Sequence, residues 1–200
     1  IPVTFSGLAG IQVLYLQFNQ LTGGVPPELG GLTTLTDLRL QSNLLTGEIP
    51  TTLSSLTNLH TLYIHLNQLS GSIPPALGNL LNLRYLHLYS NRLTGTIPPE
   101  LGALTQLVDL SLNSNSLEGP IPAELGGLTQ LQILTLNGNM LSGSIPTSLT
   151  NLTALVLSAS ATEMARMLIP STPRRSLTSM RVPGRFSRFI EICFIAILYS

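Results

Sequence analysis

Histidine and tyrosine, the side chains best suited to chemistry in this sequence, return in phase with one another. Tyr63 and His87 are 24 residues apart, and so are His65 and Tyr89. An imidazole titrates near neutrality and can ligate a metal, whereas a tyrosine ring offers a large contact area with little side-chain entropy to lose. If a 24-residue step brings these residues side by side, they could form a metal site, a pH-sensing pair or a binding surface.

Metal binding and catalysis have little support in the residues around this group. His65 and His87 would be diagonal neighbours, and we expect no cysteine, aspartate or glutamate beside them to complete a tetrahedral site. Cys193 is the single cysteine, so no disulfide forms within the chain, and it stands in an apolar stretch far from any histidine. The sequence has no phosphate-binding glycine loop, zinc-protease motif or nucleophile elbow. We therefore predict no metal, no cofactor and no catalytic residue.

The 24-residue spacing of these side chains equals the period of an internal repeat in the sequence. Each repeat follows nearly the same frame, L-x-x-L-x-L-x-x-N-x-L-x-G-x-I-P-x-x-L-x-x-L, in which glycine and proline keep step with the asparagine. The asparagine recurs six times, at Asn19, Asn43, Asn67, Asn91, Asn115 and Asn139. A fixed period of about 20 to 29 residues built on leucine and asparagine indicates a leucine-rich repeat solenoid.

Each part of this frame has a physical task in a stack of coils. The leucines close a coil, and full burial of one leucine is worth about 1.5–3 kcal/mol. A single coil cannot hide its own apolar edge, so its stability must come from stacking on its neighbours. The asparagine amide carries two donors and one acceptor oxygen, so we predict a structural hydrogen-bond column through the six asparagines.

The segment LTGTIPPELG at residues 93–102 matches the plant type of this repeat. The chain resembles the ectodomains of plant receptor-like kinases and the polygalacturonase-inhibiting proteins. This resemblance implies an α/β repeat fold: a right-handed leucine-rich repeat solenoid with a concave parallel β-sheet and a convex side of 3-10 turns and short strands. It also implies that the chain binds a protein or peptide and that it is extracellular or associated with a membrane.

Several features of those relatives are missing from this sequence. It has no N-terminal cysteine pair, signal peptide, membrane span or kinase domain, and it begins at Ile1 rather than at a methionine. We interpret it as a fragment or as a gene model that lacks its start. Any contact with a membrane would then come through missing parts of a longer chain.

The repeats fill residues 8–152, so we predict a solenoid over residues 1–152 with six 24-residue repeats from residue 8. Residues 153–200 depart from the frame and form a degenerate tail. Residues 8–151 hold three arginines and seven acidic residues, a balance of −4. Residues 152–200 hold six arginines and two acidic residues, a balance of +4, so the neutral total conceals a division of charge.

Three interpretations of this basic tail compete. We favour a disordered or mis-framed extension. A capping helix near residues 161–168 is the second, and an apolar stretch at residues 189–199 that lies in a membrane interface is the third. The arginines are dispersed and no recognisable module accompanies them, so we do not predict nucleic-acid binding.

The variable positions of each strand would face the concave side of such a solenoid. All three histidines, four of the five tyrosines and two of the three repeat arginines fall there. Tyrosine and arginine are enriched in interface hot spots. Neighbouring strands lie about 4.8 Å apart, so Tyr63 should lie beside His87, His65 beside Tyr89, and His60 beside Arg84. We predict a ligand-binding surface formed by Tyr15, Arg39, Tyr63, His65, Arg84, Tyr85, His87 and Tyr89.

The sequence favours a binding module for a protein or peptide over other classes. A fragment of a receptor-like kinase or receptor-like protein ectodomain is the main alternative, and a structural repeat protein with no dedicated ligand is the next. An enzyme has the least support. Asn151 begins an N-glycosylation sequon, which matters only if the chain is secreted.

Overall fold

A computed structural model describes residues 1–8 and 10–156 of the chain. This part covers almost all of the expected solenoid. Of the expected tail only residues 153–156 are included, so the possible capping helix, the apolar stretch and Cys193 lie outside the described residues.

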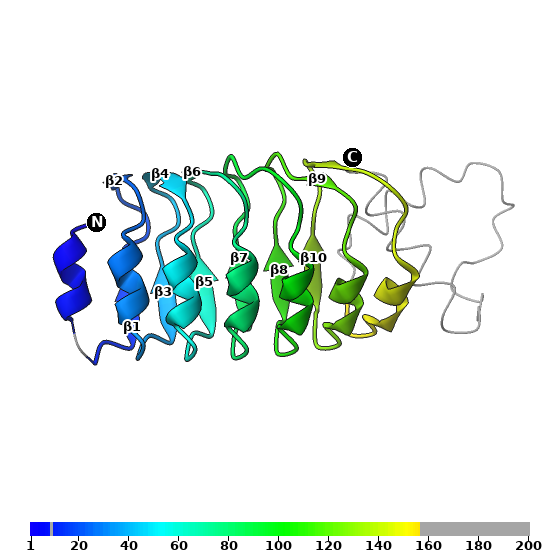
Figure 1. The fold of residues 1–200 in the computed structure, drawn as a ribbon, viewed down its shortest axis with the longest axis horizontal. Coiled ribbons are helices and arrows are strands. Elements are labelled where there is room, and N and C mark those ends of the chain that lie inside the picture. Colours follow the sequence, from blue (N-terminus) through cyan, green and yellow to red (C-terminus); the bar gives the residue numbers. More distant parts are fainter. Residues whose placement is uncertain (9, 157–200) are drawn as a thin grey trace, which may run out of the picture.

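A six-stranded parallel sheet runs the length of the array (Figure 1). Each strand pairs with the next at a register of 24 residues, as Leu38 does with Leu62. Side chains alternate along a strand. Leu38 is therefore buried inside the solenoid, while Asp37 and Arg39 lie half-buried on the solvent-facing side of the sheet. These observations confirm the predicted parallel sheet. In spatial order its strands are β1 (Val13–Tyr15), β3 (Asp37–Arg39), β5 (Thr61–Tyr63), β7 (Tyr85–His87), β8 (Asp109–Ser111) and β10 (Ile133–Thr135).

Short 3-10 helices form a second row of elements beside the sheet (Figure 1). Each follows a proline in extended conformation; Pro74, for example, has φ −63° and ψ 124°. Proline suits this place because its ring fixes φ and it has no N–H to satisfy. The helices are η1 (Val3–Gly7), η2 (Pro27–Gly31), η3 (Thr51–Ser55), η4 (Pro75–Asn79), η5 (Pro99–Ala103), η6 (Ala123–Gly127) and η7 (Thr147–Asn151).

Two smaller parallel sheets occupy the remaining side of the coils. They belong to the stretch between the repeat asparagine and the proline, and they complete the predicted side of short strands and 3-10 turns. One joins β2 (Thr22–Gly23), β4 (Leu44–Glu48) and β6 (Gln68–Ser70); the other joins β9 (Glu118–Gly119) and β11 (Met140–Leu141).

The core is one continuous stack of leucines and isoleucines. In the third coil Leu62, Leu69, Leu77 and Leu80 are completely buried. Each such leucine contributes about 1.5–3 kcal/mol by leaving water. Because the buried side chains of one coil pack on those of the next, no coil holds this core alone.

The repeat asparagines tie each coil to the one before it. The Oδ1 of Asn67 accepts the backbone N–H of Leu45 at 3.0 Å. Its Nδ2 donates to the carbonyl of Leu40 in the preceding coil and to that of Ile64 in its own coil, both at 3.1 Å. Asn19 differs, because it donates only to carbonyls within its own coil. The two-coil pattern recurs at Asn43, Asn91, Asn115 and Asn139.

Two glycine positions of the repeat have different physical causes; the first is glycine in all six repeats, and the second is glycine in four of them. Gly47 has φ +76° and open space where a Cβ would lie, so the left-handed backbone is what favours glycine there. Gly78 lies in a row of closely packed helices, where a Cβ would meet the carbonyl oxygen of Glu100 at 2.5 Å. The first glycine shapes a turn, and the second allows neighbouring coils to approach.

Replacing Asn67 with alanine should weaken the solenoid more than the same change at Asn19. Asn67→Ala leaves backbone groups of two coils without partners, so we expect a loss of about 2–4 kcal/mol in the free energy of unfolding. Asn19→Ala is the matched control and should cost less than about 1 kcal/mol, because Asn19 is exposed and bonds only its own coil. Urea unfolding of both variants measures the difference; equal losses would contradict the two-coil role.

Candidate functional site

The 24-residue register arranges outward-facing side chains in rows that cross the six-stranded sheet. Backbone hydrogen bonds carry this register beyond the strands, as between the N–H of Ser42 and the carbonyl of His65 at 3.1 Å. We name as the central row the last residues of four successive strands, Tyr15, Arg39, Tyr63 and His87. We name as the second row the residues two positions further along each coil, Gln17, Gln41, His65 and Tyr89.

Aromatic rings of the third and fourth repeats stack in pairs on this face. The Tyr63 and His87 rings lie 4.2 Å apart between centroids and 13° from parallel. The His65 and Tyr89 rings lie 4.2 Å apart and 18° from parallel. A tilted contact of 5.5 Å between His65 and His87 joins the two pairs. The structure thus brings together four of the residues that the sequence selected.

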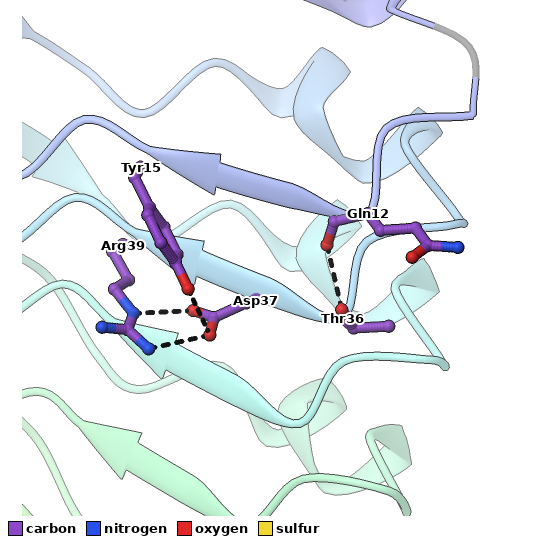
Figure 2. Close-up of polar contacts among 5 residues, drawn as sticks. All are labelled: Gln12, Tyr15, Thr36, Asp37 and Arg39. Atoms are coloured by element: carbon purple, nitrogen blue, oxygen red, sulfur yellow. Dashed lines mark hydrogen bonds and ion pairs between the residues drawn. The ribbon is translucent and has the colours of Figure 1, made fainter.

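Arg39 links Tyr15 of the first repeat to the rest of the central row. Its guanidinium makes two hydrogen bonds of 2.9 Å to Asp37, and the hydroxyl of Tyr15 donates to the same carboxylate at 3.1 Å. Figure 2 shows these three side chains meeting above neighbouring strands, with Thr36 bound to the carbonyl of Gln12 nearby. The hydrogen bonds that Arg39 donates to the Asp37 carboxylate raise the pKa of Arg39 above its usual value, so the guanidinium stays charged.

The charge of Arg39 also lies against two tyrosine rings. Its Cζ is 4.5 Å from the centroid of Tyr15 and 5.4 Å from that of Tyr63. A cation at this range is attracted to the negative face of an aromatic ring. The central row is therefore a continuous series of contacts from the first strand to His87.

An aspartate stands beside the histidine pair, contrary to the sequence-based expectation. The Oδ2 of Asp109 lies 2.9 Å from the Nε2 of His87, and its Oδ1 accepts the hydroxyl of Ser111 at 2.7 Å. The expectation was wrong because it considered direct neighbours, whereas Asp109 reaches His87 diagonally from the position that pairs with Tyr85. Within residues 1–8 and 10–156, no group of three histidine, cysteine or acidic side chains could hold a metal ion.

His65 is the least accessible of the predicted site residues. It is 7% exposed because the rings of its neighbours cover it. Burial, followed by the charge of nearby His87, lowers the pKa of His65 to about 4. The ring is therefore neutral at pH 7, and little of its surface is accessible. Burial raises the pKa of Tyr63 and Tyr89, so both remain neutral phenols.

Arg84 and Tyr85 lie near the start of β7, at the other end of the strands from the second row. Arg84 is exposed, and within the described residues its guanidinium makes no hydrogen bond or ion pair. Its backbone N–H bonds the carbonyl of His60 at 2.9 Å, which places the two residues side by side as expected. Tyr85 is half-buried. Arg84 adds an exposed cation, and Tyr85 a half-buried phenol, to the start of β7.

Two exposed apolar residues beside the second row were absent from the predicted set. Phe18 is 74% exposed and Leu66 is 46% exposed. A signal for them exists in the sequence, since the other four repeats have serine or glycine immediately before the asparagine. The buried side-chain oxygens of Gln17 and Gln41, which have no hydrogen-bond partner within the described residues, could not have been found this way.

Asn151, the residue of the glycosylation sequon, is exposed at the end of η7. Its side chain is therefore accessible to a modifying enzyme. Within the part of the chain that the structure describes, no helix is long and apolar enough to cross a membrane.

The buried His65 should make folding stability depend on pH. Its pKa is about 4 in the folded chain against an ordinary 6.5, so the unfolded chain binds a proton between these values that the folded chain does not. Stability is then complete above pH 6.5 and decreases toward pH 4, by about 2–3 kcal/mol. In His65→Gln this part of the decrease should vanish when urea unfolding is compared at pH 7 and pH 4. The same pH dependence in both proteins would contradict it.

Two models of known protein families together match most of this repeat array. A family model described as "Leucine rich repeat" matches residues 82–141, and a second with the same description matches residues 10–32, 34–56 and 58–80. A comparison with curated proteins finds no match.

Solved structures similar to the chain include plant receptor ectodomains. The leucine-rich repeat ectodomain of the Arabidopsis thaliana receptor kinase GASSHO1/SCHENGEN3, in complex with CASPARIAN STRIP INTEGRITY FACTOR 2, is 48% identical with a TM-score of 0.77. The match covers 78% of this chain and 19% of that one. The plant peptide hormone receptor RGFR1, in complex with RGF2, is 43% identical with a TM-score of 0.77, over 78% of this chain and 25% of the receptor.

A third similar structure is shorter. The ectodomain of the receptor kinase SOBIR1 from Arabidopsis thaliana is 34% identical with a TM-score of 0.62, and the match covers 65% of this chain and 72% of that one. The chain thus spans only about a fifth to a quarter of the two longer receptors. The repeat frame, the stacked coils and these matches together show that the chain belongs to the leucine-rich repeat family, in its plant type.

Proposed function

We propose that this repeat array is a recognition module that binds a protein or peptide through the face of its six-stranded sheet. The observation that carries the proposal is the connected series of side chains on this face, from Tyr15 and Arg39 through the stacked Tyr63 and His87. His65 joins this series through its ring contacts with Tyr63 and His87, and Tyr89 stacks on His65. Arg84 and Tyr85 lie on the fourth coil, at and just before the start of β7.

The mechanism is burial of aromatic side chains that are already held in place. Each tyrosine and histidine of the two stacked pairs is held by a ring packed on it, and His87 also contacts Asp109 at 2.9 Å. Fixing a mobile side chain costs about 0.5–1.5 kcal/mol on binding. A face whose side chains are restrained before a partner arrives avoids much of this cost, which supports binding rather than a purely structural role.

The similar structures support a peptide or protein as the class of partner. One is a receptor ectodomain in complex with CASPARIAN STRIP INTEGRITY FACTOR 2, and another is described as a peptide hormone receptor in complex with RGF2. We propose by analogy that this array acts outside the cell and binds its partner without catalysing a reaction.

An alternative to a free-standing binding module is that the array forms part of a receptor-like ectodomain. The 48% identity to a receptor kinase ectodomain favours it. Sequencing the complete transcript distinguishes the two possibilities, because a receptor predicts a membrane span in the same frame and a free-standing binder does not. A structural repeat protein without a ligand predicts that no partner is found at all.

Alanine at Tyr63, Tyr85 and His87 together should abolish binding. We take as probes the peptides that a phage-displayed random library yields on the wild-type chain. Loss of three central contacts should weaken their binding by about 100-fold or more, since hot-spot residues each contribute about 2 kcal/mol.

The matched control for this triple variant lies on the same sheet. Alanine at Gln132, Ile133 and Thr135 removes equivalent positions of the sixth repeat and should leave binding within about threefold. Circular dichroism should be unchanged in both variants. Binding that survives the first variant and is lost in the second would place the site elsewhere on the sheet.

A further inference from the structure

The sixth repeat leaves part of the leucine core uncovered at the C-terminal end of the array. Leu112 and Leu117 of the fifth repeat are completely buried. Leu136 and Leu141 hold the same frame positions in the sixth repeat, yet they are only partly buried. Elsewhere in the array the next coil covers leucines at these positions. We name as the end face the partly buried leucines of the sixth repeat, Leu134, Leu136 and Leu141.

The backbone hydrogen bonds that join successive coils are also open at this end. In the fifth repeat the N–H groups of Leu112 and Ser114 donate to carbonyls of the sixth repeat, both at 2.9 Å. The corresponding N–H groups of Leu136 and Gly138 have no hydrogen-bond partner within residues 1–8 and 10–156. An edge with unpaired backbone groups is a template for another segment, and here it lies beside apolar side chains.

The chain itself leads onto this edge. The N–H of Val156 donates to the carbonyl of Gln132 at 2.8 Å, just as the N–H of Gln132 donates to the carbonyl of Val108 at 2.8 Å. Val156 therefore continues the 24-residue register into a further coil. Because neighbouring strands lie about 4.8 Å apart, the same register would place Ser160 beside Leu136. The residues directly after Val156 are thus the nearest segment that could cover the end face.

Another leucine coil cannot supply this cover from the sequence that follows. The repeat frame requires leucine at positions 158 and 160 and asparagine at position 163. The chain has Ser158, Ser160 and Glu163 at these positions. Serine lacks the apolar side chain that fills the core, and a carboxylate has no N–H to donate to the neighbouring coil. An element of another kind must close the core, as in repeat arrays whose terminal unit has a polar outer side.

The sequence of residues 160–168 has the pattern of a short amphipathic helix. Ser160 and Glu163 match a capping box, in which each side chain bonds the backbone N–H of the other residue. Four apolar residues recur at the i, i+3, i+4 and i+7 spacing of one helix face: Ala161, Met164, Ala165 and Leu168. Pro170 ends the pattern, because the residue before a proline avoids helical backbone. This pattern provides one apolar side and one polar side, which is what a terminal cover needs.

We propose that residues 160–168 dock on the end face as an amphipathic cap. The side that carries Met164 and Leu168 packs on the uncovered leucines, and the side that carries Thr162 and Arg166 faces water. The open end of the array therefore favours the capping interpretation of the tail over the other two. The cap is independent of the proposed function, because it uses no residue of the predicted ligand-binding surface.

Amide hydrogen exchange of the full chain tests the cap. Met164→Gln with Leu168→Gln removes the apolar side but keeps residues that favour a helix. Amides of residues 133–136 should then exchange about tenfold faster or more, because the last coil opens to water, while amides of residues 61–64 in the third repeat should not change. Thr162→Gln with Arg166→Gln is the matched control on the opposite side, and it should leave exchange within about twofold of the wild type.

Three results would overturn this proposal. Unprotected amides at residues 133–136 of the wild-type chain would mean that nothing covers the end face. Protected amides that exchange equally in the wild type and in the Met164→Gln, Leu168→Gln variant would assign the cover to another segment. A dimer in light scattering, with protection of residues 133–136 that falls on dilution, would assign the cover to a second copy of the chain.

Discussion

Each coil of this protein can bury its leucines only against the coil beside it. Leu62 and Leu77 are completely buried because neighbouring coils cover them. The asparagine column fixes how the coils align, since the amide of Asn67 bonds two coils at once. A slip of one residue would break these bonds and turn the leucines outward. The 24-residue register on which the whole molecule depends is therefore held by burial and hydrogen bonding together.

The same register arranges the side chains on the solvent-facing side of the six-stranded sheet. It places the Tyr63 ring on that of His87 and the His65 ring on that of Tyr89. A carboxylate contacts the series at each end, Asp37 of the second repeat at Arg39 and Asp109 of the fifth repeat at His87. A partner thus meets side chains that restrain one another. This order on the surface distinguishes the first five repeats from the sixth, whose outward positions carry mainly small or uncharged groups.

Features that depend only on spacing could be predicted from the sequence. The parallel sheet and the neighbours of Tyr63 and His65 follow from counting residues. Features that depend on side-chain reach or backbone conformation could not: Asp109 meets His87 along a diagonal, and the positive φ of Leu66 has no signature in its residue type. The burial of His65 arises from the rings around it, so it emerges only once all of them are in place.

Nuclear Overhauser effects between aromatic rings in solution test the central claim most directly, namely that the repeat register builds an ordered surface from neighbouring coils. With centroids 4.2 Å apart, ring protons of Tyr63 should show cross-peaks to His87, and those of His65 to Tyr89. Alanine at one member of a pair should remove only that pair's cross-peaks. If folded protein shows neither set of cross-peaks, the rings do not restrain one another and the ordered surface does not form.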